Sequence, residues 1–151
     1  MTLRFYLTVL VAIVVALPAA AQAGRIDFAT DLSGPSSLAV LADGRVLVSE
    51  DGDIDRVSAL AADGTRTDYA TGLQNPDGLA VLNDGRVLVA EFSFNRVSAL
   101  APDGTRTDYA TGLSTPTRVV ALDDGRVLVT ESNAGRVSVL APDGTRTDYA
   151  T

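Results

Sequence analysis

The sequence has no cysteine, histidine, tryptophan or lysine, and each absence removes a class of chemistry. Without cysteine and histidine the chain can form no disulfide, thiolate nucleophile, imidazole base or zinc site of the usual ligands. A metal ion would have to be bound by oxygen, which favours calcium or magnesium. The basic side chains are 12 arginines against 19 acids, and the net charge is −7. Because an acidic surface repels phosphate backbones, nucleic acid is not an expected partner.

A long hydrophobic run is confined to the first 23 residues. Arg4 precedes an apolar stretch at 5–17, and Ala21-Gln22-Ala23 is a small-x-small cleavage site that places the mature start at Gly24. Pro18 ends the apolar run after 13 residues, whereas a membrane-spanning helix needs roughly 18. The pattern predicts a cleaved export signal over 1–23, no stable membrane anchor, and a secreted or periplasmic protein.

The remainder of the chain, residues 24–151, is a tandem repeat with a period of 40 or 41 residues. Three blocks recur: DGRVLV at 43–48, 84–89 and 124–129; RVS(A/V)L at 56–60, 96–100 and 136–140; and DGTRTDYAT at 63–71, 103–111 and 143–151. Such a period is typical of a supersecondary unit that buries its apolar surface only against neighbouring copies.

Each repeat is predicted to form four short antiparallel strands, which in the first copy lie at 38–41, 45–49, 56–60 and 65–71. Asp-Gly turn signals join the first strand to the second and the third to the fourth. Four strands in about 40 residues, repeated in tandem, predict an all-β fold of β-propeller blades. The blades are expected at 35–75, 76–115 and 116–151. A parallel β-helix is the rival fold, but it lacks two hairpin signals per repeat.

Residues 25–34, RIDFATDLSG, match the fourth strand and its following loop at 66–75 and 106–115. We therefore expect a leading outer strand whose own blade is missing its other strands. Propellers close with roughly four to eight blades, so three blades make about half of a six-bladed ring. The favoured explanation is the N-terminal half of a longer ring, and the alternative is a homodimer of two half-rings.

Candidate binding residues lie in the loops that differ between the repeats. These loops, at 51–55, 92–95, 132–135, 33–37, 74–78 and 114–118, are expected on one face of the propeller. They supply the candidate ligand-binding residues Phe92, Phe94, Asn95, Asn133, Arg118 and Asp77. Two simpler explanations stay open: drift in exposed loops, and packing of the two phenylalanines on the next blade.

Acidic residues cluster in the first of these loops, where the candidate metal ligands are Glu50, Asp51, Asp53 and Asp55. Clustered carboxylates suit calcium. The helix-loop-helix calcium pattern fails, however, because Arg56 and Ala62 stand where it needs glycine and glutamate. A solvated acidic loop is the alternative.

A glutamate ends the second strand of every repeat, at Glu50, Glu91 and Glu131. Three carboxylates facing a channel could serve acid-base or metal chemistry. A residue that recurs in each repeat more often satisfies loop amides or pairs with a recurrent arginine, and Arg56, Arg96 and Arg136 are such arginines. We therefore favour a structural role for the glutamates.

The segment PDGLAVLNDGRVLVAEFSFNRVSAL at 76–100 resembles the repeat of NHL-type six-bladed propellers. TESNAGRVSVLAPDGTRTDY at 130–149 is similar to blades of the streptogramin (virginiamycin B) lyases, which are related to the gluconolactonase group. The resemblance covers 25–151 and implies a propeller fold. The lyases use a histidine and magnesium, and this chain has no histidine. The gluconolactonases bind metal through an early inner-strand glutamate, and the matching strand here, SSLAVL, has no acid.

The sequence therefore predicts an exported NHL-like propeller that binds or scaffolds a protein, a small molecule or a carbohydrate. The alternative is a metal-dependent lactonase or lyase whose catalytic residues lie outside this sequence. A third hypothesis is a recently amplified repeat without a selected site, since 101–111 and 141–151 are identical.

Overall fold

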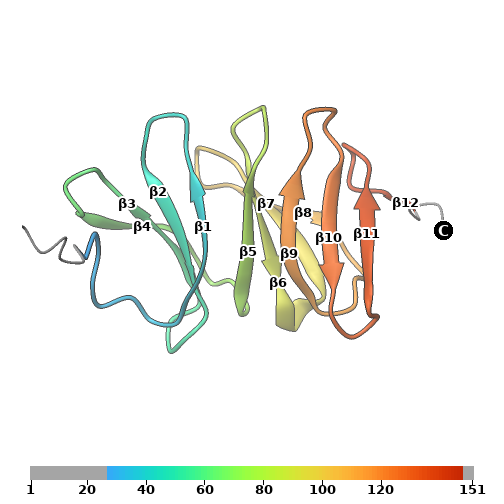
Figure 1. The fold of residues 1–151 in the computed structure, drawn as a ribbon, viewed down its shortest axis with the longest axis horizontal. Coiled ribbons are helices and arrows are strands. Elements are labelled where there is room, and N and C mark those ends of the chain that lie inside the picture. Colours follow the sequence, from blue (N-terminus) through green and yellow to red (C-terminus); the bar gives the residue numbers. More distant parts are fainter. Residues whose placement is uncertain (1–26, 148–151) are drawn as a thin grey trace, which may run out of the picture.

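The computed structural model describes residues 27–147, which form three four-stranded antiparallel sheets (Figure 1). The first sheet holds β1 (Pro35–Val40), β2 (Val46–Glu50), β3 (Arg56–Leu60) and β4 (Arg66–Thr71). The second holds β5 (Pro76–Val81), β6 (Val87–Glu91), β7 (Arg96–Leu100) and β8 (Arg106–Ala110), with the short 3-10 helix η1 (Phe92–Phe94) after β6. The third holds β9 (Pro116–Ala121), β10 (Val127–Glu131), β11 (Arg136–Leu140) and β12 (Arg146–Thr147).

Within each sheet the strands pair in chain order, so each sheet is one meander. The prediction of four-stranded antiparallel blades is confirmed, and we number the sheets blades 1 to 3. The predicted export signal at 1–23 lies outside the described residues. No helix between residues 27 and 147 has the length and apolar character needed to cross a membrane.

The Asp-Gly-Arg sequence closes the first hairpin of every blade. In blade 1 the Arg45 N–H donates to Asp43 Oδ1 at 3.0 Å, and Gly44 has a φ of 87° that disfavours other residues. Asp84 and Asp124 accept from Arg86 and Arg126 in the same way. These hairpins lie along the upper edge of Figure 1, whereas the loops that follow β2, β6 and β10 lie along the lower edge.

The apolar core lies at the two junctions between neighbouring blades. We call the side of a blade that meets the following blade its front face, and the opposite side its back face. Leu47 and Val57 on the front of blade 1 pack with Val87 and Val89 on the back of blade 2. The junction between blades 2 and 3 repeats this pattern with the equivalent residues. The strand with consecutive apolar residues is therefore buried on both faces, as its sequence predicted.

Residues 27–34 form no strand in the structure, which differs from the expected leading strand; residues 25 and 26 are outside the described part. Each described sheet already has a fourth strand, so no third strand offers them an edge. The segment nevertheless lies where the end of the fourth strand of a preceding blade would lie. The Arg66 Nη1 donates to the Asp31 carbonyl at 2.7 Å, as Arg106 does to the Gly72 carbonyl at 2.7 Å.

Candidate functional site

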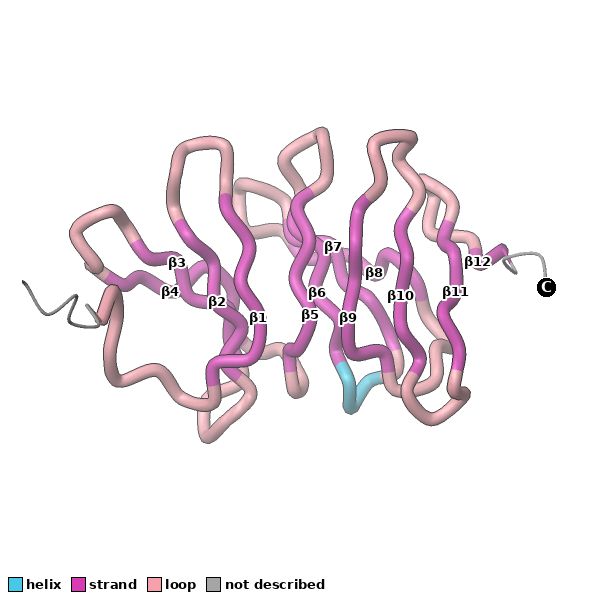
Figure 2. Tube along the Cα trace, viewed as in Figure 1, coloured by secondary structure: helices cyan, strands magenta, loops and turns pink. Residues whose placement is uncertain are grey.

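The loops that differ between the repeats gather at one edge of the molecule, as η1 in Figure 2 marks. Each loop is tied to the connection that precedes its blade by a backbone hydrogen bond at an equivalent position. The Phe92 N–H donates to the Asn75 carbonyl at 3.2 Å, and Asp51 and Ser132 make the equivalent bonds at 3.1 Å. The scaffold thus holds loops of unlike sequence in equivalent places.

A cavity of about 280 Å³ lies at this edge between blades 1 and 2. It is lined by Asp51, Asn75, Asp77 and Phe92. Three of these were candidates from the sequence, one as a metal ligand and two as ligand-binding residues. Asn75 was missed as an individual residue, although it lies in one of the variable connections.

Arg118 reaches this site from the third blade. Its guanidinium forms a hydrogen bond and ion pair with Asp77 Oδ1, which also accepts a hydrogen bond from the Ser36 hydroxyl. Ser36, Asp77 and Arg118 stand near the starts of β1, β5 and β9, so each blade contributes one polar side chain to this group. Unlike the scaffold residues, these three differ from blade to blade.

Gly78 allows β9 to approach β5 closely enough for Asp77 and Arg118 to pair. A Cβ atom at this position would lie 2.6 Å from the Thr117 carbonyl oxygen and 2.7 Å from Arg118 Cα, which is closer than real side chains allow. The equivalent residues in the other two blades are Ser37 and Arg118. The glycine therefore permits a contact between blades that lies directly beside the Asp77–Arg118 pair.

The two candidate phenylalanines have different surroundings. Phe92 is 41% exposed and lines the cavity. Phe94 is 53% exposed and lies 4.9 Å from the guanidinium of Arg96, which stacks over its ring. Neither ring is buried against a neighbouring blade. Only Phe92 is placed to contact a ligand in the cavity.

The two candidate asparagines lie in the loop framework rather than on the cavity wall. Asn95 has a left-handed φ of 52°, which ends η1, and its Oδ1 accepts a hydrogen bond from the Thr115 N–H at 2.9 Å. The Asn133 N–H donates to the Thr115 hydroxyl at 2.9 Å. Both residues therefore fix the connection that leads into β9.

The acidic candidates do not form a metal site in the structure. Glu50 is fully buried and accepts hydrogen bonds from Arg56 Nε at 2.9 Å, the Ser33 N–H at 2.7 Å and the Ser58 hydroxyl. Asp51 and Asp53 are exposed, and Asp55 Oδ1 is buried without a hydrogen-bond partner. Between residues 27 and 147 no three acidic side chains are grouped to hold a metal ion. The predicted calcium ligands Glu50, Asp51, Asp53 and Asp55 are not brought together, because Glu50 points inward to Arg56.

The structural role favoured for the recurrent glutamates is confirmed. Glu91 and Glu131 repeat the hydrogen bonds of Glu50, to Arg96, Ser98 and Gln74 in blade 2 and to Arg136, Ser138 and Ser114 in blade 3. Burial alone would raise the pKa of Glu131, but these hydrogen bonds outweigh it and lower the pKa to about 2. The pKa of Glu50 is lowered for the same reasons. In all three blades both oxygens of the carboxylate accept hydrogen bonds from the protein.

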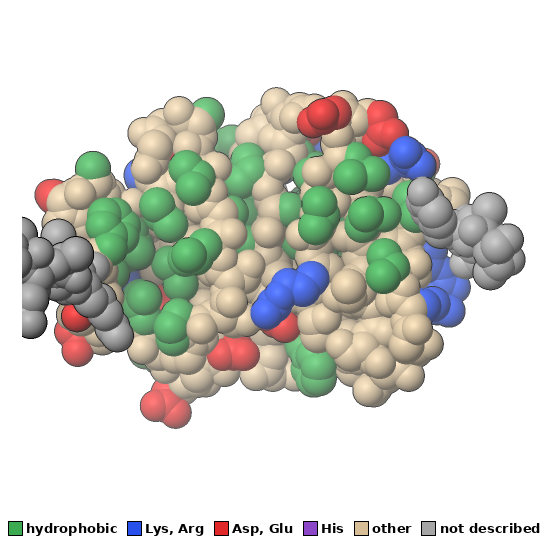
Figure 3. Space-filling view, viewed as in Figure 1, with side chains coloured by type: hydrophobic (Ala, Val, Ile, Leu, Met, Phe, Trp, Pro, Cys, Tyr) green, Lys and Arg blue, Asp and Glu red, His purple; other side chains and the backbone are tan. Residues whose placement is uncertain are grey.

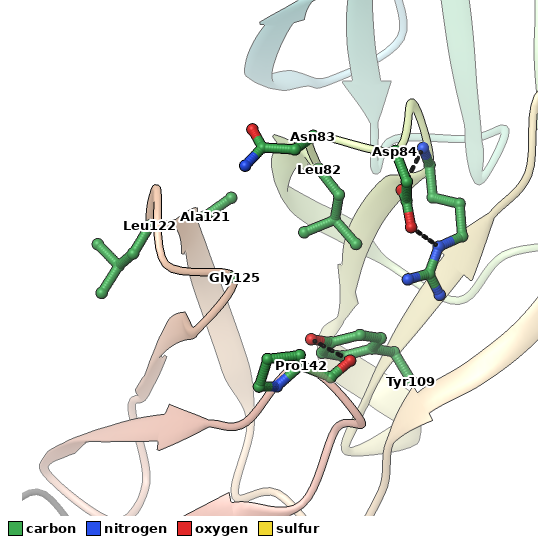
Figure 4. A pocket seen from close by; sticks show the side chains of 9 residues that line it. Leu82, Asn83, Asp84, Tyr109, Ala121, Leu122, Gly125 and Pro142 are labelled. Atoms are coloured by element: carbon green, nitrogen blue, oxygen red, sulfur yellow. Dashed lines mark hydrogen bonds and ion pairs between the residues drawn. The ribbon is translucent and has the colours of Figure 1, made fainter.

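A different cavity, of about 160 Å³, lies between neighbouring hairpins at the opposite edge (Figure 4). Tyr109 and Pro142 form part of its wall, and the tyrosine hydroxyl donates to the Ala141 carbonyl at 3.1 Å. The junction between blades 1 and 2 has a cavity lined at equivalent positions, which include Tyr69 and Pro102. Because its lining recurs with the repeat and its tyrosine is already bonded, this cavity belongs to the scaffold.

No protein-family model matches the sequence, and no curated protein matches it at a significant score. Solved structures do match. Virginiamycin B lyase from Staphylococcus aureus has a TM-score of 0.68 at 23% identity, over 79% of this chain and 42% of that one. A gluconolactonase from Xanthomonas campestris has a TM-score of 0.68 at 22% identity, over 76% and 46%. A chain of a nidogen/laminin complex has a TM-score of 0.71 at 20% identity, over 79% and 48%.

The chain folds as part of a β-propeller. These identities show the shared fold alone, and the sequence spans about half the length of the propellers that it matches. The matched propellers include enzymes as well as a chain from a complex between proteins.

In a propeller the blades surround a central channel, and the inner strands β1, β5 and β9 lie side by side here (Figure 1). Asp77 and Arg118 lie near the starts of the inner strands β5 and β9. The pair is therefore at the end of the channel that also holds the cavity of Asp51, Asn75 and Phe92. In the space-filling view acidic side chains gather along this lower edge (Figure 3). The propeller thus presents a polar, mostly acidic site with one exposed aromatic ring at its channel mouth.

Proposed function

We propose that this propeller is an exported binding module that holds a sugar-like ligand at its channel mouth, in the cavity of Asp51, Asn75, Asp77 and Phe92. The observation that carries the proposal is the contrast between this group and the scaffold. The cavity gathers side chains that differ from blade to blade, whereas hairpin and buried residues repeat almost unchanged. Binding sites are commonly built in this way, from variable loops on a rigid framework.

The chemistry of the cavity suits a hydroxyl-rich ring. Two carboxylates and an amide accept hydrogen bonds from hydroxyl groups, while the Arg118 guanidinium donates them. The exposed ring of Phe92 offers an apolar surface on which the C–H face of a sugar can pack. The cavity volume of about 280 Å³ is near the lower end of ligand sites. A mono- or disaccharide unit of a larger glycan is therefore the ligand class that we favour.

A glycan array probed with fluorescently labelled protein tests the proposal. Phe92→Ser should lose at least about tenfold in affinity, since it removes the apolar contact worth roughly 1.5–3 kcal/mol. Phe94→Ser is the matched control, because Phe94 has similar exposure but lies against Arg96 outside the cavity. No binding to any glycan, or equal losses in the two variants, would contradict the proposal.

A metal-dependent lactonase or lyase is the alternative function. It is favoured by the fold shared with virginiamycin B lyase and a gluconolactonase. The described residues group no set of acidic ligands for a metal, so this alternative needs catalytic residues from elsewhere. Lactone hydrolysis assayed with added magnesium, calcium or manganese separates the alternatives. Turnover that depends on the metal would support the enzyme and displace the binding module.

A further inference from the structure

The front face of blade 3 has apolar residues at the same positions as the fronts of blades 1 and 2, but it is only partly covered: Val139 is buried, as its equivalents Ala59 and Ala99 are. Val57 and Val97 are fully buried in the two junctions, whereas their equivalent, Val137, is 54% exposed. Leu47 and Leu88 are likewise fully buried, whereas Leu128 is partly exposed. The open face therefore resembles a junction that lacks its second half.

A cavity of about 460 Å³ lies on this face. It is lined by Leu122, Arg126, Leu128 and Val137. In blade 2 the equivalent apolar positions pack with back-face residues of the following blade, including Val119, Val127, Val129 and Leu140. The partner that fits the cavity is thus the back face of another blade of this repeat.

The chain carries such a back face at its other end, and this face is open in part: Val48 and Leu60, the equivalents of Val89 and Leu100, are buried within one copy. Leu38 and Val40 on β1 are 67% and 65% exposed, although Leu79 and Val119, the equivalents of Leu38, are buried by the preceding blade. Figure 3 shows hydrophobic side chains on the surface formed by the inner strands β1, β5 and β9. An exposed apolar patch rimmed by polar residues commonly marks a protein interface.

We propose that the front of blade 3 in one copy packs on the back of blade 1 in a second copy, head to tail. The contact continues the two junctions already present within the chain. Val137 and Leu38 would share one apolar cluster, as Val57 shares one with Leu79 and Val97 with Val119. The occupant is a second copy because the matching surface is present on the same chain.

Two such contacts would close a ring of two copies. The chain spans 39% to 48% of the length of the propellers that it matches, so two copies supply roughly one complete ring. Head-to-tail contacts give closed rings when the rotation between copies closes, and open filaments when it does not. The ring also surrounds the channel mouth on all sides, which the three blades alone do not.

The segment at 27–34 sets how the copies meet. It already occupies the place of a preceding outer strand against blade 1, through the bond from Arg66 to Asp31. The copy that docks through its blade 3 therefore contributes β9, β10 and β11 to the junction. Its fourth strand, β12, must move aside, because residues 27–34 of the other copy occupy that place. Within the described residues β12 pairs with β11 through Arg146 and Thr147, and the docked segment would take the place of these pairs.

Size exclusion with light scattering on the full chain, over a range of concentrations, tests the contact. The unmodified protein should be a discrete dimer. Leu38→Arg and Val137→Asp should each raise the dissociation constant about a hundredfold, because each buries an unpaired charge. Both positions are exposed within one copy, so both variants should keep the thermal stability of the monomer. Phe94→Arg is the control, since it adds a charge at an exposed ring far from either open face.

Mixing the two variants gives the decisive result. In the mixed dimer one junction places the arginine of the Leu38→Arg copy against the aspartate of the Val137→Asp copy, and the other junction is unmodified. The two opposite charges pair, so Leu38→Arg and Val137→Asp together should restore the dimer. A monomer at every concentration overturns the proposal and indicates that other blades cover the faces. An oligomer that grows with concentration, or a dimer that neither variant weakens, overturns it as well.

Discussion

The buried carboxylate of blade 2 permits a prediction with a calculable size. Glu91 Oε1 accepts from Arg96 Nε at 2.9 Å and from the Ser98 hydroxyl, and Oε2 accepts from Arg96 Nη2 at 3.1 Å and the Gln74 N–H at 3.0 Å. The variant Glu91→Gln keeps the shape but replaces one acceptor oxygen with a donor NH₂ group. Two hydrogen bonds of the set are lost, and the guanidinium loses its counter-charge.

Hydrogen bonds to charged groups contribute about 1.5–3 kcal/mol each, and breaking a buried ion pair costs about 3–5 kcal/mol. We therefore expect Glu91→Gln to lower the free energy of unfolding by about 3–5 kcal/mol. The matched control is Asp84→Asn, because the exposed pair of Asp84 with Arg86 is worth about 0–1 kcal/mol.

Urea unfolding followed by circular dichroism measures both variants. Both the midpoint and the slope of the unfolding free energy against urea concentration are measured. An unchanged slope shows that the variant exposes the same surface on unfolding. A loss below about 1 kcal/mol for Glu91→Gln, or a loss equal to that of Asp84→Asn, would refute the structural role of the buried carboxylate.

Two further predictions concern acid stability and the contact between blades. Because the folded pKa of Glu131, about 2, lies below its ordinary value of 4.5, its contribution to stability is complete above pH 4.5 and is lost as the pH falls towards 2. Thermal unfolding between about pH 2 and 7 should show this loss, and Glu131→Gln should flatten it; an unchanged profile would contradict the assignment. Gly78→Ala should cost about 1–3 kcal/mol and weaken glycan binding, because the new methyl group forces β9 away and moves Arg118 from Asp77. The control is Gly112→Ala, where no atom lies within 4 Å of the added carbon. It should lower the free energy of unfolding by about 1 kcal/mol, because its φ of 68° disfavours alanine, and leave glycan binding intact. Equal effects of the two variants on binding would count against the close approach at Gly78.

Much of the fold could be predicted because each hairpin is specified locally. The Asp43 carboxylate and the positive φ of Gly44 fix a turn with no help from distant residues. β1 begins at Pro35, before the predicted 38, because its first residues pair with β2 across an irregular register that no apolar pattern reveals. Residues 27–34 form no strand because a strand needs an edge to pair with, and each described sheet already has its fourth strand.

The candidate site was predictable in part. The variable loops lie at one edge, and of the candidate residues Asp77, Phe92 and Asp51 line one cavity there. The pairing of Asp77 with Arg118 was not predictable, because the two residues are 41 positions apart and meet only across a junction between blades. Gly78 was the one local signal, since the other blades have side chains at its position.

The buried glutamates have a consequence for how this protein could be redesigned. Each holds its loop through a main-chain N–H, of Ser33, Gln74 or Ser114, and not through a side chain. Any residue other than proline can provide that donor. The residues that contact a ligand can therefore be exchanged without loosening this main-chain anchor, provided that the side-chain contacts between blades, such as Asp77 with Arg118 and Asn95 with Thr115, are kept.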